Sequence, residues 1–307
     1  MGDGTGISWT DATWNPVRGC SRVSEGCRHC YAEIVAGRFS GPGQAYEGLA
    51  KRVQRGAGST TEGRWTGEVR LVPEHLADPL RWKRPRRIFV NSMSDLFHEK
   101  LTNEEIAAVF GVMAAAPQHT FQVLTKRAAR MREWFEWIDD HDIRTCAKEA
   151  LLHLGGPHDC PWEREICAEW PWALPNVWLG VSVENQDAAD ERIIELLKTP
   201  AAVRFLSCEP LLGAIDLAAA SPNARSLAED LDWIIAGCES GRGARPCDVA
   251  WLRSLRDQCD AAHVPFFLKQ AIGELIPIVS LGAGSREKGH GIIELPYLDG
   301  VQHAAFP

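Results

Sequence analysis

The stretch RIFVNSMSD at residues 87–95 joins a short apolar run to a polar cluster, and this combination decides the fold. Thr102-x-x-Glu105 follows it, a capping box that predicts the start of a helix. The same order of apolar run, polar residues and amphipathic helix recurs at residues 119–138, where HTFQVL leads into Thr125-Lys126-Arg127. Continuous apolar runs are typical of parallel strands whose two faces are both covered.

Further apolar runs toward the C-terminus repeat this pattern, and each of them ends in polar residues. They lie at 176–181, 203–207, 231–236 and 264–268. Helices are also predicted over 31–39, over 73–83 and from a cap at Asp248. Repeated strand–helix units favour either a βα barrel or a doubly wound sheet. All strand ends of a barrel converge on one centre, whereas an open sheet focuses them at one crevice. Because polar residues follow nearly every run, the sequence predicts an α/β fold, a partial or modified TIM barrel of parallel βα units.

The domain organisation is predicted to be one barrel domain over residues 1–270. Two segments interrupt the strand–helix rhythm and are predicted to be insertions: a Gly- and Ser-rich excursion near 41–67 and a charged segment near 139–175. Residues 271–307 are Gly-rich with little periodicity, so we predict a C-terminal extension there.

The charge balance is acidic, with 41 Asp and Glu against 33 Lys and Arg and a net charge of −8. This disfavours nucleic-acid binding driven by bulk charge, although a local basic groove is compatible with it. The basic run at 83–87 is predicted to be a solvated turn in preference to a phosphate-binding patch.

The compartment is predicted to be the cytoplasm, with no membrane partner. No apolar run approaches the ~20 residues that span a bilayer, and the N-terminus lacks the basic-then-apolar order of a signal peptide. The ten cysteines are then expected to be reduced, so metal binding or burial explains them better than disulfides.

Cys20, Cys27 and Cys30 lie within eleven residues, and we call residues 20–30 the Cys loop. Thiolates are soft ligands that select zinc, copper(I) or iron–sulfur clusters. With His29 as a fourth ligand, a structural zinc knuckle is an alternative of about equal weight on spacing alone. The Cys loop therefore predicts a metal centre.

The loop also resembles the radical S-adenosylmethionine (SAM) superfamily, because Tyr31, an aromatic residue, follows the last cysteine ahead of βα units. More closely, several motifs in order resemble a phage-associated three-Cys-motif family of unknown function. These are WTDATWNP (9–16), NSMSDLF (91–97), LTKR (124–127), LGVSVEN (179–185) and EPL (209–211). The first spacer departs from the superfamily pattern, since this chain has C-x6-C-x2-C where C-x3-C-x2-C is common.

The resemblance implies that Cys20, Cys27 and Cys30 hold three irons of a [4Fe–4S] cluster and that SAM chelates the fourth. Reductive cleavage of SAM would then yield a 5′-deoxyadenosyl radical that abstracts hydrogen from a substrate. An electron donor such as flavodoxin or ferredoxin is the implied partner. If the chain is phage-encoded, its compartment is the host cytoplasm.

Polar residues at the strand ends are the predicted SAM ligands. By resemblance, the SAM amine binds at the end of the second strand and the ribose at the end of the fourth. Each residue alone is more simply a strand-end cap, whereas together they favour a site. The predicted cofactor-binding residues are Asn91, Ser92, Ser94, Asp95, Lys126, Ser182, Glu184, Asn185, Glu209 and Glu239.

Three cations accompany these residues, namely Lys126, Arg127 and Lys269, and they could hold the SAM carboxylate or a phosphate. Alternatively, each pairs with one of the carboxylates Asp95, Glu209 or Glu239. Arg242 and Arg245 form a weaker phosphate-loop candidate.

The remaining cysteines carry weaker hypotheses. Cys208 and Cys238 follow strands and are candidate catalytic hydrogen donors, although small core residues are the simpler interpretation. A second metal site is conceivable in the segment near 139–175, where incidental thiols are favoured; its candidates are Cys146, Cys160, Cys167, His153 and His158.

The function predicted from the sequence is a radical SAM enzyme acting on a nucleic-acid base or nucleotide, in DNA modification or repair. One alternative is a zinc-stabilised, non-catalytic protein that binds nucleic acid or another partner. Another is a barrel hydrolase with Glu209 and Glu239 as paired carboxylates, which leaves the Cys loop unexplained.

Overall fold

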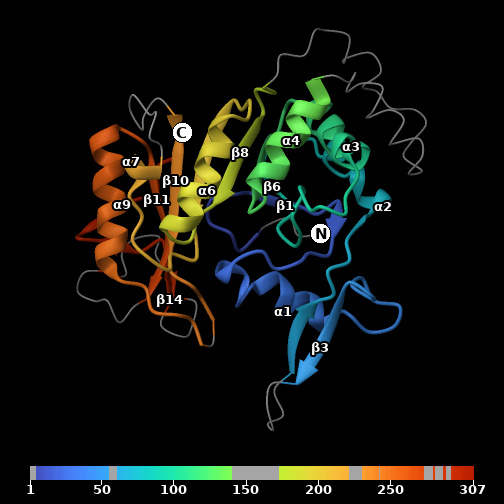
Figure 1. Cartoon of the computed structure of the whole chain (residues 1–307), viewed down its shortest axis with the longest axis horizontal. Helices are drawn as coiled ribbons and strands as arrows, with labels where there is room; N and C mark the ends of the chain where they lie inside the picture. Colours follow the sequence, from blue (N-terminus) through green and yellow to red (C-terminus); the bar gives the residue numbers. More distant parts are fainter. Residues whose placement is uncertain are drawn as a thin grey trace. The chain divides into compact units, whose positions relative to one another are not determined.

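The structure is a computed structural model (Figure 1). It describes residues 5–54, 61–139, 173–220, 230–241, 243–272, 279–280, 286–287 and 292–307. The chain divides into two compact units, which are described separately. The first unit comprises 1–5, 10–178 and 200–202, and the second comprises 6–9, 179–199 and 203–307. The predicted second metal site at 140–172, and Arg242, lie outside the described residues.

The first unit is built on β1 (Ala12–Trp14), β6 (Arg87–Val90) and β7 (Thr120–Thr125), followed by β8 (Val177–Ser182). Their hydrogen-bonded order is β1-β6-β7-β8, and the unit boundary falls within β8. β1 pairs with β6 and β6 pairs with β7, both in parallel. The sequence pattern indicated β6, β7 and β8 but missed β1, whose three residues are too few to show a periodicity.

Helices α3 (Asn103–Ala114) and α4 (Ala128–Asp139) follow β6 and β7, as predicted. The capping box at Thr102 is present: its side chain accepts from the Glu105 N–H, and the Glu105 carboxylate accepts from the Thr102 N–H. The Phe110 ring of α3 stacks on the Trp134 ring of α4, with centroids 4.4 Å apart. The sequence therefore fixes these βα units by local capping and by an apolar face.

The helix expected from Pro73 is shorter than its pattern suggested. It divides into α2 (Pro73–Leu76) and the 3-10 turn η2 (Pro79–Arg81). Pro79 has no N–H to continue the helical ladder, which accounts for the break.

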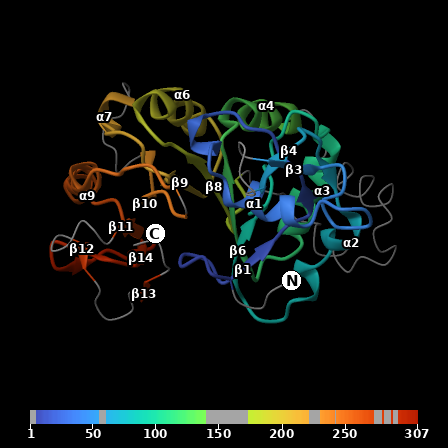
Figure 2. The same cartoon turned by 90° about the horizontal axis from the view of Figure 1, so that it is seen from below.

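The segment near 41–67 contains an antiparallel hairpin of β3 (Ala50–Gln54) and β4 (Thr61–Trp65). Helix α1 (Tyr31–Arg38), predicted from the sequence, lies beside this hairpin (Figure 2). Gly63 permits the close approach, because a Cβ atom there would lie 2.0 Å from the Glu33 carbonyl oxygen. Nearby, β2 (Val17–Arg18) pairs with β5 (Arg70–Leu71), and the short 3-10 helix η1 (Glu25–Cys27) lies within the Cys loop.

The second unit continues from β8 through β9 (Val203–Cys208), β10 (Trp233–Gly237) and β11 (Phe266–Ile272) to β14 (Ile292–Glu294) and β13 (Arg286–Glu287). β10 is parallel to β9 and β11, whereas β14 is antiparallel to β11 and β13. The described helices are α6 (Gln186–Leu197), α7 (Leu217–Ala220) and α9 (Val249–Ala262). As predicted, Asp248 caps α9, and its carboxylate accepts from the Ala250 N–H.

The segment 271–307 contributes β13 and β14 to this sheet. It also forms a second sheet of β12 (Val279–Ser280), β15 (Tyr297–Leu298) and β16 (Val301–Gln302). Strands of two or three residues leave no readable period in the sequence. The core packs around Trp233, whose ring lies 5.7 Å from Phe205 and 5.9 Å from Phe267.

The prediction of an α/β fold with mostly parallel strands is confirmed. The single-domain boundaries stay a prediction. Among the helices that the structure describes, none combines the length and apolarity that a bilayer crossing requires.

Candidate functional site

The Cys loop lies between β1 and α1 in the first unit, and Cys30 is the N-cap residue of α1. Its three cysteines are free and partly exposed. Burial raises the pKa of the Cys20 thiol to about 12; Asp95 and the other two loop cysteines also raise it, whereas Arg127 lowers it.

Arg127, two residues after β7, contacts Cys20 and Ser21 of the loop, and its side chain is only 7% exposed. Its Nη1 donates to Asp95 Oδ2 at 3.1 Å and lies 3.9 Å from Cys20 Sγ. Its Nε donates to Glu99 Oε2 at 2.9 Å. Burial opposes the charge, but Asp95, Cys20 and Glu99 raise the pKa of Arg127 further, so the guanidinium stays charged.

Ser21 anchors the loop to the same arginine. Arg127 Nη2 donates to Ser21 Oγ at 2.8 Å and to the Ser21 carbonyl at 3.2 Å. His98 Nε2 lies 2.9 Å from Ser21 Oγ, which in turn donates to Glu99 Oε1 at 3.3 Å. We call these six residues the Arg127 network: Cys20, Ser21, Asp95, His98, Glu99 and Arg127.

His98 is fully buried and has a defined tautomer. The Lys100 N–H donates to His98 Nδ1 at 3.2 Å, so the ring proton sits on Nε2 and is directed at Ser21. Burial lowers the pKa of His98, and the Arg127 charge lowers it further. His98 is therefore a neutral donor that fixes the position of the loop.

Asp95 was predicted to bind the SAM amine, but its oxygens are engaged by the protein. Oδ1 accepts from Thr125 Oγ1 at 2.7 Å and from the Phe97 N–H at 3.0 Å. Oδ2 accepts from the Lys126 N–H at 3.1 Å as well as from Arg127. Four bonds fill the capacity of a carboxylate, so in this structure Asp95 positions Arg127.

Asn91, Ser92 and Ser94 join the end of β6 to the segment that follows β1. Asn91 has a left-handed backbone (φ 58°), and its Oδ1 accepts from the Val17 N–H at 3.2 Å. Ser94 Oγ donates to the Val17 carbonyl at 2.9 Å, and Ser92 Oγ donates to Asn15 Oδ1 at 3.2 Å. In the described part of the chain, Asn91 Nδ2 is buried without a hydrogen-bond partner. As an N–H donor, this group suits a carboxylate and not the predicted ammonium.

Glu33 of α1 is a second anchor for the loop. It is 3% exposed, and its carboxylate accepts from Arg22 Nε at 3.0 Å and from the Trp65 N–H at 2.9 Å. Arg22 Nη2 also donates to the Arg28 carbonyl at 2.9 Å. The Cys loop is thus tied to α1 and to the hairpin.

In the second unit, the residues predicted at the end of β8 are engaged locally. Asn185 caps α6, and its Oδ1 accepts from the Ala188 N–H at 3.0 Å. Arg192 Nη1 donates to Glu184 Oε2 at 2.8 Å and to the Ser182 carbonyl at 2.7 Å. The simpler interpretation as a cap is confirmed for Asn185.

Glu209 and Glu239 also have cationic partners. Lys269 Nζ lies 2.7 and 2.8 Å from the two Glu209 oxygens. Arg245 Nε donates to Glu239 Oε2 at 3.0 Å, and its backbone N–H donates to the same oxygen at 2.9 Å. Neither carboxylate is left as an uncompensated acid or base, so this pairing does not favour the hydrolase alternative.

Cys208 and Cys238, the proposed hydrogen donors, are fully buried in the second unit. Burial raises the pKa of the Cys208 thiol. This environment suits a small core residue, and hydrogen donation stays a prediction.

Sequence reasoning brought Cys20, Asp95 and Arg127 together correctly but missed Ser21, His98 and Glu99. The only signal was their place beside motifs already identified, since His98 and Glu99 follow NSMSDLF and Ser21 follows Cys20. Within the described ranges, no three His, Cys, Asp or Glu side chains form a group that could hold a metal ion as they lie.

Comparison with known proteins identifies one family. Residues 4–307 match the family described as "Protein of unknown function (DUF5131)". No curated protein and no solved structure matches the chain.

Proposed function

The chain belongs to the DUF5131 family, and we propose that it is a radical SAM enzyme with a [4Fe–4S] cluster on the Cys loop. One observation carries the proposal. The loop lies in the connection that runs from β1, the edge strand of a parallel series, through β2 to α1, and Arg127, two residues after β7, lies 3.9 Å from Cys20 Sγ. In α/β folds, active sites gather at the carboxyl ends of the parallel strands, and the Cys loop comes after one of these ends.

The residues present fit such a cluster in their chemistry. Three cysteine thiolates on one loop are the ligand type that iron–sulfur clusters use, and three ligands leave one iron open. A cluster on three thiolates carries net negative charge, and the Arg127 guanidinium, which also pairs with Asp95 and Glu99, would offset part of it. Hydrogen bonds and charges beside the sulfurs are among the factors that set a cluster's potential.

Cys20, Cys27 and Cys30 would hold the cluster, and bound SAM would supply the radical that abstracts hydrogen. Arg127, His98 and Ser21 fix the first cysteine by the bonds described above. Asn91 Nδ2, a buried donor at the end of β6, is available to an acceptor such as the SAM carboxylate.

In the second unit, the residues predicted to bind SAM stay predictions from the sequence, and the proposal does not rest on them. Binding of SAM by Ser182, Glu184, Asn185, Glu209 or Glu239 would have to coexist with the ion pairs and the cap that now engage them. Hydrogen bonds from the ribose hydroxyls can be accepted by carboxylates that are already paired, because each carboxylate has several lone pairs.

Anaerobic reconstitution tests the proposal. The protein is incubated with iron and sulfide, then reduced with dithionite in the presence of SAM, and 5′-deoxyadenosine is quantified. We expect about four irons and four sulfides per chain, and a yield that depends on the Cys loop. A Cys27→Ala variant should lose both iron and product. Cys259→Ala, which changes a buried cysteine of α9 in the second unit, is the matched control and should retain both.

Two outcomes would contradict the proposal. The first is a colourless protein with one stoichiometric zinc that iron and sulfide do not displace, which would favour the zinc-stabilised binding protein. The second is equal formation of 5′-deoxyadenosine by the native chain and the Cys27→Ala variant.

A further inference from the structure

Helix α1 presents an exposed apolar surface directly beside the Cys loop. Among the described residues, the exposed large apolar side chains are Val301 and a group within residues 23–39. Tyr31 and Phe39 are each 51% exposed, Val23 is 45% exposed and Ile34 is 42% exposed. Apolar side chains gathered in this way mark an interaction surface more often than isolated ones do.

The geometry of the helix places two of these side chains, Tyr31 and Ile34, on one stripe with Arg38. Tyr31, Ile34 and Arg38 have the i, i+3, i+7 spacing of one helical face, and all three are exposed, whereas Ala32 and Ala36 are buried. Tyr31 Oη donates to the Ser92 carbonyl at 2.6 Å, which fixes its ring. A fixed, half-exposed aromatic ring is a ready stacking platform because little side-chain freedom is lost on binding.

The same region is basic in an acidic protein. Residues 17–71 contain nine Lys and Arg against five Asp and Glu, whereas the whole chain has a net charge of −8. Arg38 and Lys51 are exposed, and neither has an ion-pair partner in the described parts of the chain. Exposed cations and exposed aromatic rings in one region of the first unit suit an anionic ligand that also stacks.

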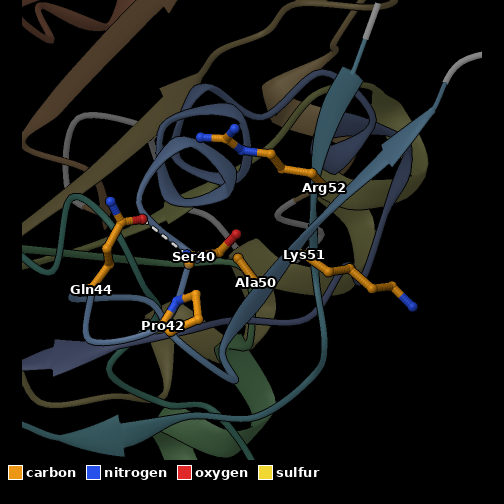
Figure 3. A pocket seen from close by; sticks show the side chains of 7 residues that line it. Ser40, Pro42, Gln44, Ala50, Lys51 and Arg52 are labelled. Carbon is orange, nitrogen blue, oxygen red and sulfur yellow. Dashed lines mark hydrogen bonds between the residues drawn. The ribbon is translucent and has the colours of Figure 1, made fainter.

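A cavity of about 520 Å³ adjoins this surface at the end of α1 (Figure 3). Its lining includes Ser40, Pro42, Lys51 and Arg52. Arg52 donates to the Gly37 carbonyl at 2.8 Å and to the Arg38 carbonyl at 2.6 Å, so its charge offsets the negative end of the helix dipole. Figure 3 shows the Lys51 side chain extending away from Ser40 and Pro42.

We propose that this surface binds single-stranded nucleic acid. We call it the α1 surface: Val23, Tyr31, Ile34, Arg38, Phe39 and Lys51. Nonspecific single-strand sites combine stacking aromatics with cations that track the phosphates, and the α1 surface supplies both. The remainder of the chain carries a net charge of −12, which opposes a long duplex lying across the molecule. An acidic peptide would match the charge but offers no row of bases to exposed rings.

The α1 surface begins where the Cys loop ends, because α1 starts at Tyr31 directly after Cys30. A strand bound there would pass beside the proposed cluster. The role of the bound strand as a substrate therefore rests on the proposed function, whereas binding of the strand to the α1 surface does not.

The test is fluorescence anisotropy of a labelled single-stranded 12-mer DNA with the full chain, before and after cluster reconstitution. Native protein should bind without the cluster, with an affinity that falls as salt rises. Phe39→Ala should weaken binding at least about fivefold, because stacking is worth 1–3 kcal/mol per base. Lys51→Gln should lower the slope of log K against log salt by about 0.7, the value for one phosphate contact on a single strand.

Matched controls lie in the second unit. Val301→Ala removes another exposed apolar side chain, and Lys198→Gln removes another exposed lysine, so both should bind within twofold of the native chain. Far-UV circular dichroism verifies that each variant is folded.

Four outcomes would overturn the inference. Two concern the single strand: no binding of the 12-mer at low salt, or affinities of Phe39→Ala and Lys51→Gln for it that lie within twofold of native. The other two concern competing ligands: equal or tighter binding of the matching duplex, or binding of the protein to anionic lipid vesicles alone. Formation of 5′-deoxyadenosine without oligonucleotide binding would sink this inference and leave the proposed function intact. If the protein binds the oligonucleotide but never assembles a cluster on reconstitution, the proposed function fails and the binding inference stands.

Discussion

Two buried arginines, Arg127 in the first unit and Arg192 in the second, follow the ends of strands but serve different purposes. Arg192 of α6 bonds to Glu184 and to the Ser182 carbonyl, both in its own β8–α6 connection. Arg127 bonds to Asp95 and Glu99 after β6 and to Ser21 of the Cys loop. A local pair closes one strand–helix unit, whereas the Arg127 network joins segments that are far apart in sequence.

The difference lies in how the cations near the strand ends are paired. In the described part of the second unit, three strand-end carboxylates each pair with a different cation: Glu184 with Arg192, Glu209 with Lys269 and Glu239 with Arg245. In the first unit one cation is shared by two carboxylates, a hydroxyl and a thiol. Sharing directs the N–H groups of Arg127 at Ser21 and Cys20 of the Cys loop, whereas each one-to-one pair holds its cation on a single carboxylate.

The largest effect is expected from Arg192→Met. The substitution removes the guanidinium that pairs with the Glu184 carboxylate, which is 1% exposed, and breaking a buried pair in this way costs about 3–5 kcal/mol. Urea unfolding followed by tryptophan fluorescence measures the loss. In the double variant Glu184→Gln/Arg192→Met, much of it should be recovered, since no buried charge remains. A loss of unfolding free energy below about 1 kcal/mol in Arg192→Met would show that water solvates the Glu184 carboxylate.

Arg127→Met should cost less global stability, about 1–3 kcal/mol, because Asp95 keeps three other hydrogen bonds. Its main effect should be local, because Ser21 loses both bonds from the guanidinium. Hydrogen–deuterium exchange should accelerate across residues 20–30 but not across α6. Arg192→Met is the matched comparison. If hydrogen–deuterium exchange in the Cys loop accelerates equally in both variants, the two arginines do not differ in this role.

Lys269→Met should have a smaller effect, about 1 kcal/mol, because Glu209 is 17% exposed and water can solvate it. The same urea measurement applies. A loss as large as that of Arg192→Met would mean that exposure does not decide the cost of breaking these pairs.

The smallest effect is expected from pH, through His98. Its pKa is lowered in the folded state, so between that pKa and about 6.5 the unfolded chain binds more protons than the folded chain. Stability contributed by His98 is therefore complete above about pH 6.5 and declines on acidification, by at most about 1.4 kcal/mol per pH unit. The midpoint of urea unfolding between pH 7 and pH 5 should fall less in His98→Gln. An equal fall of the midpoint in the native chain and in His98→Gln would contradict a contribution of His98 to the pH dependence.

The sequence alone determined the units of the fold. Apolar runs predicted β6, β7, β8, β9, β10 and β11, and the caps at Thr102 and Asp248 predicted α3 and α9, because period and capping act over a few residues. The short strand β1, the hairpin of β3 and β4, and the strands after residue 272 were not visible. Strands of two or three residues are too short to show a period. The hairpin of β3 and β4 packs against α1, and this contact is not readable from the local sequence.

The candidate site divides in the same way. The sequence identified Cys20, Cys27 and Cys30 as a metal-type loop, and it allowed Arg127 and Lys269 to pair with strand-end carboxylates. It could not assign Lys269 to Glu209, Arg127 to Asp95, or His98 to Ser21, since these partners lie 60, 32 and 77 residues apart. Which side chains meet over such separations depends on strand order and on the bonds that the buried groups require, and only the tertiary structure decides both.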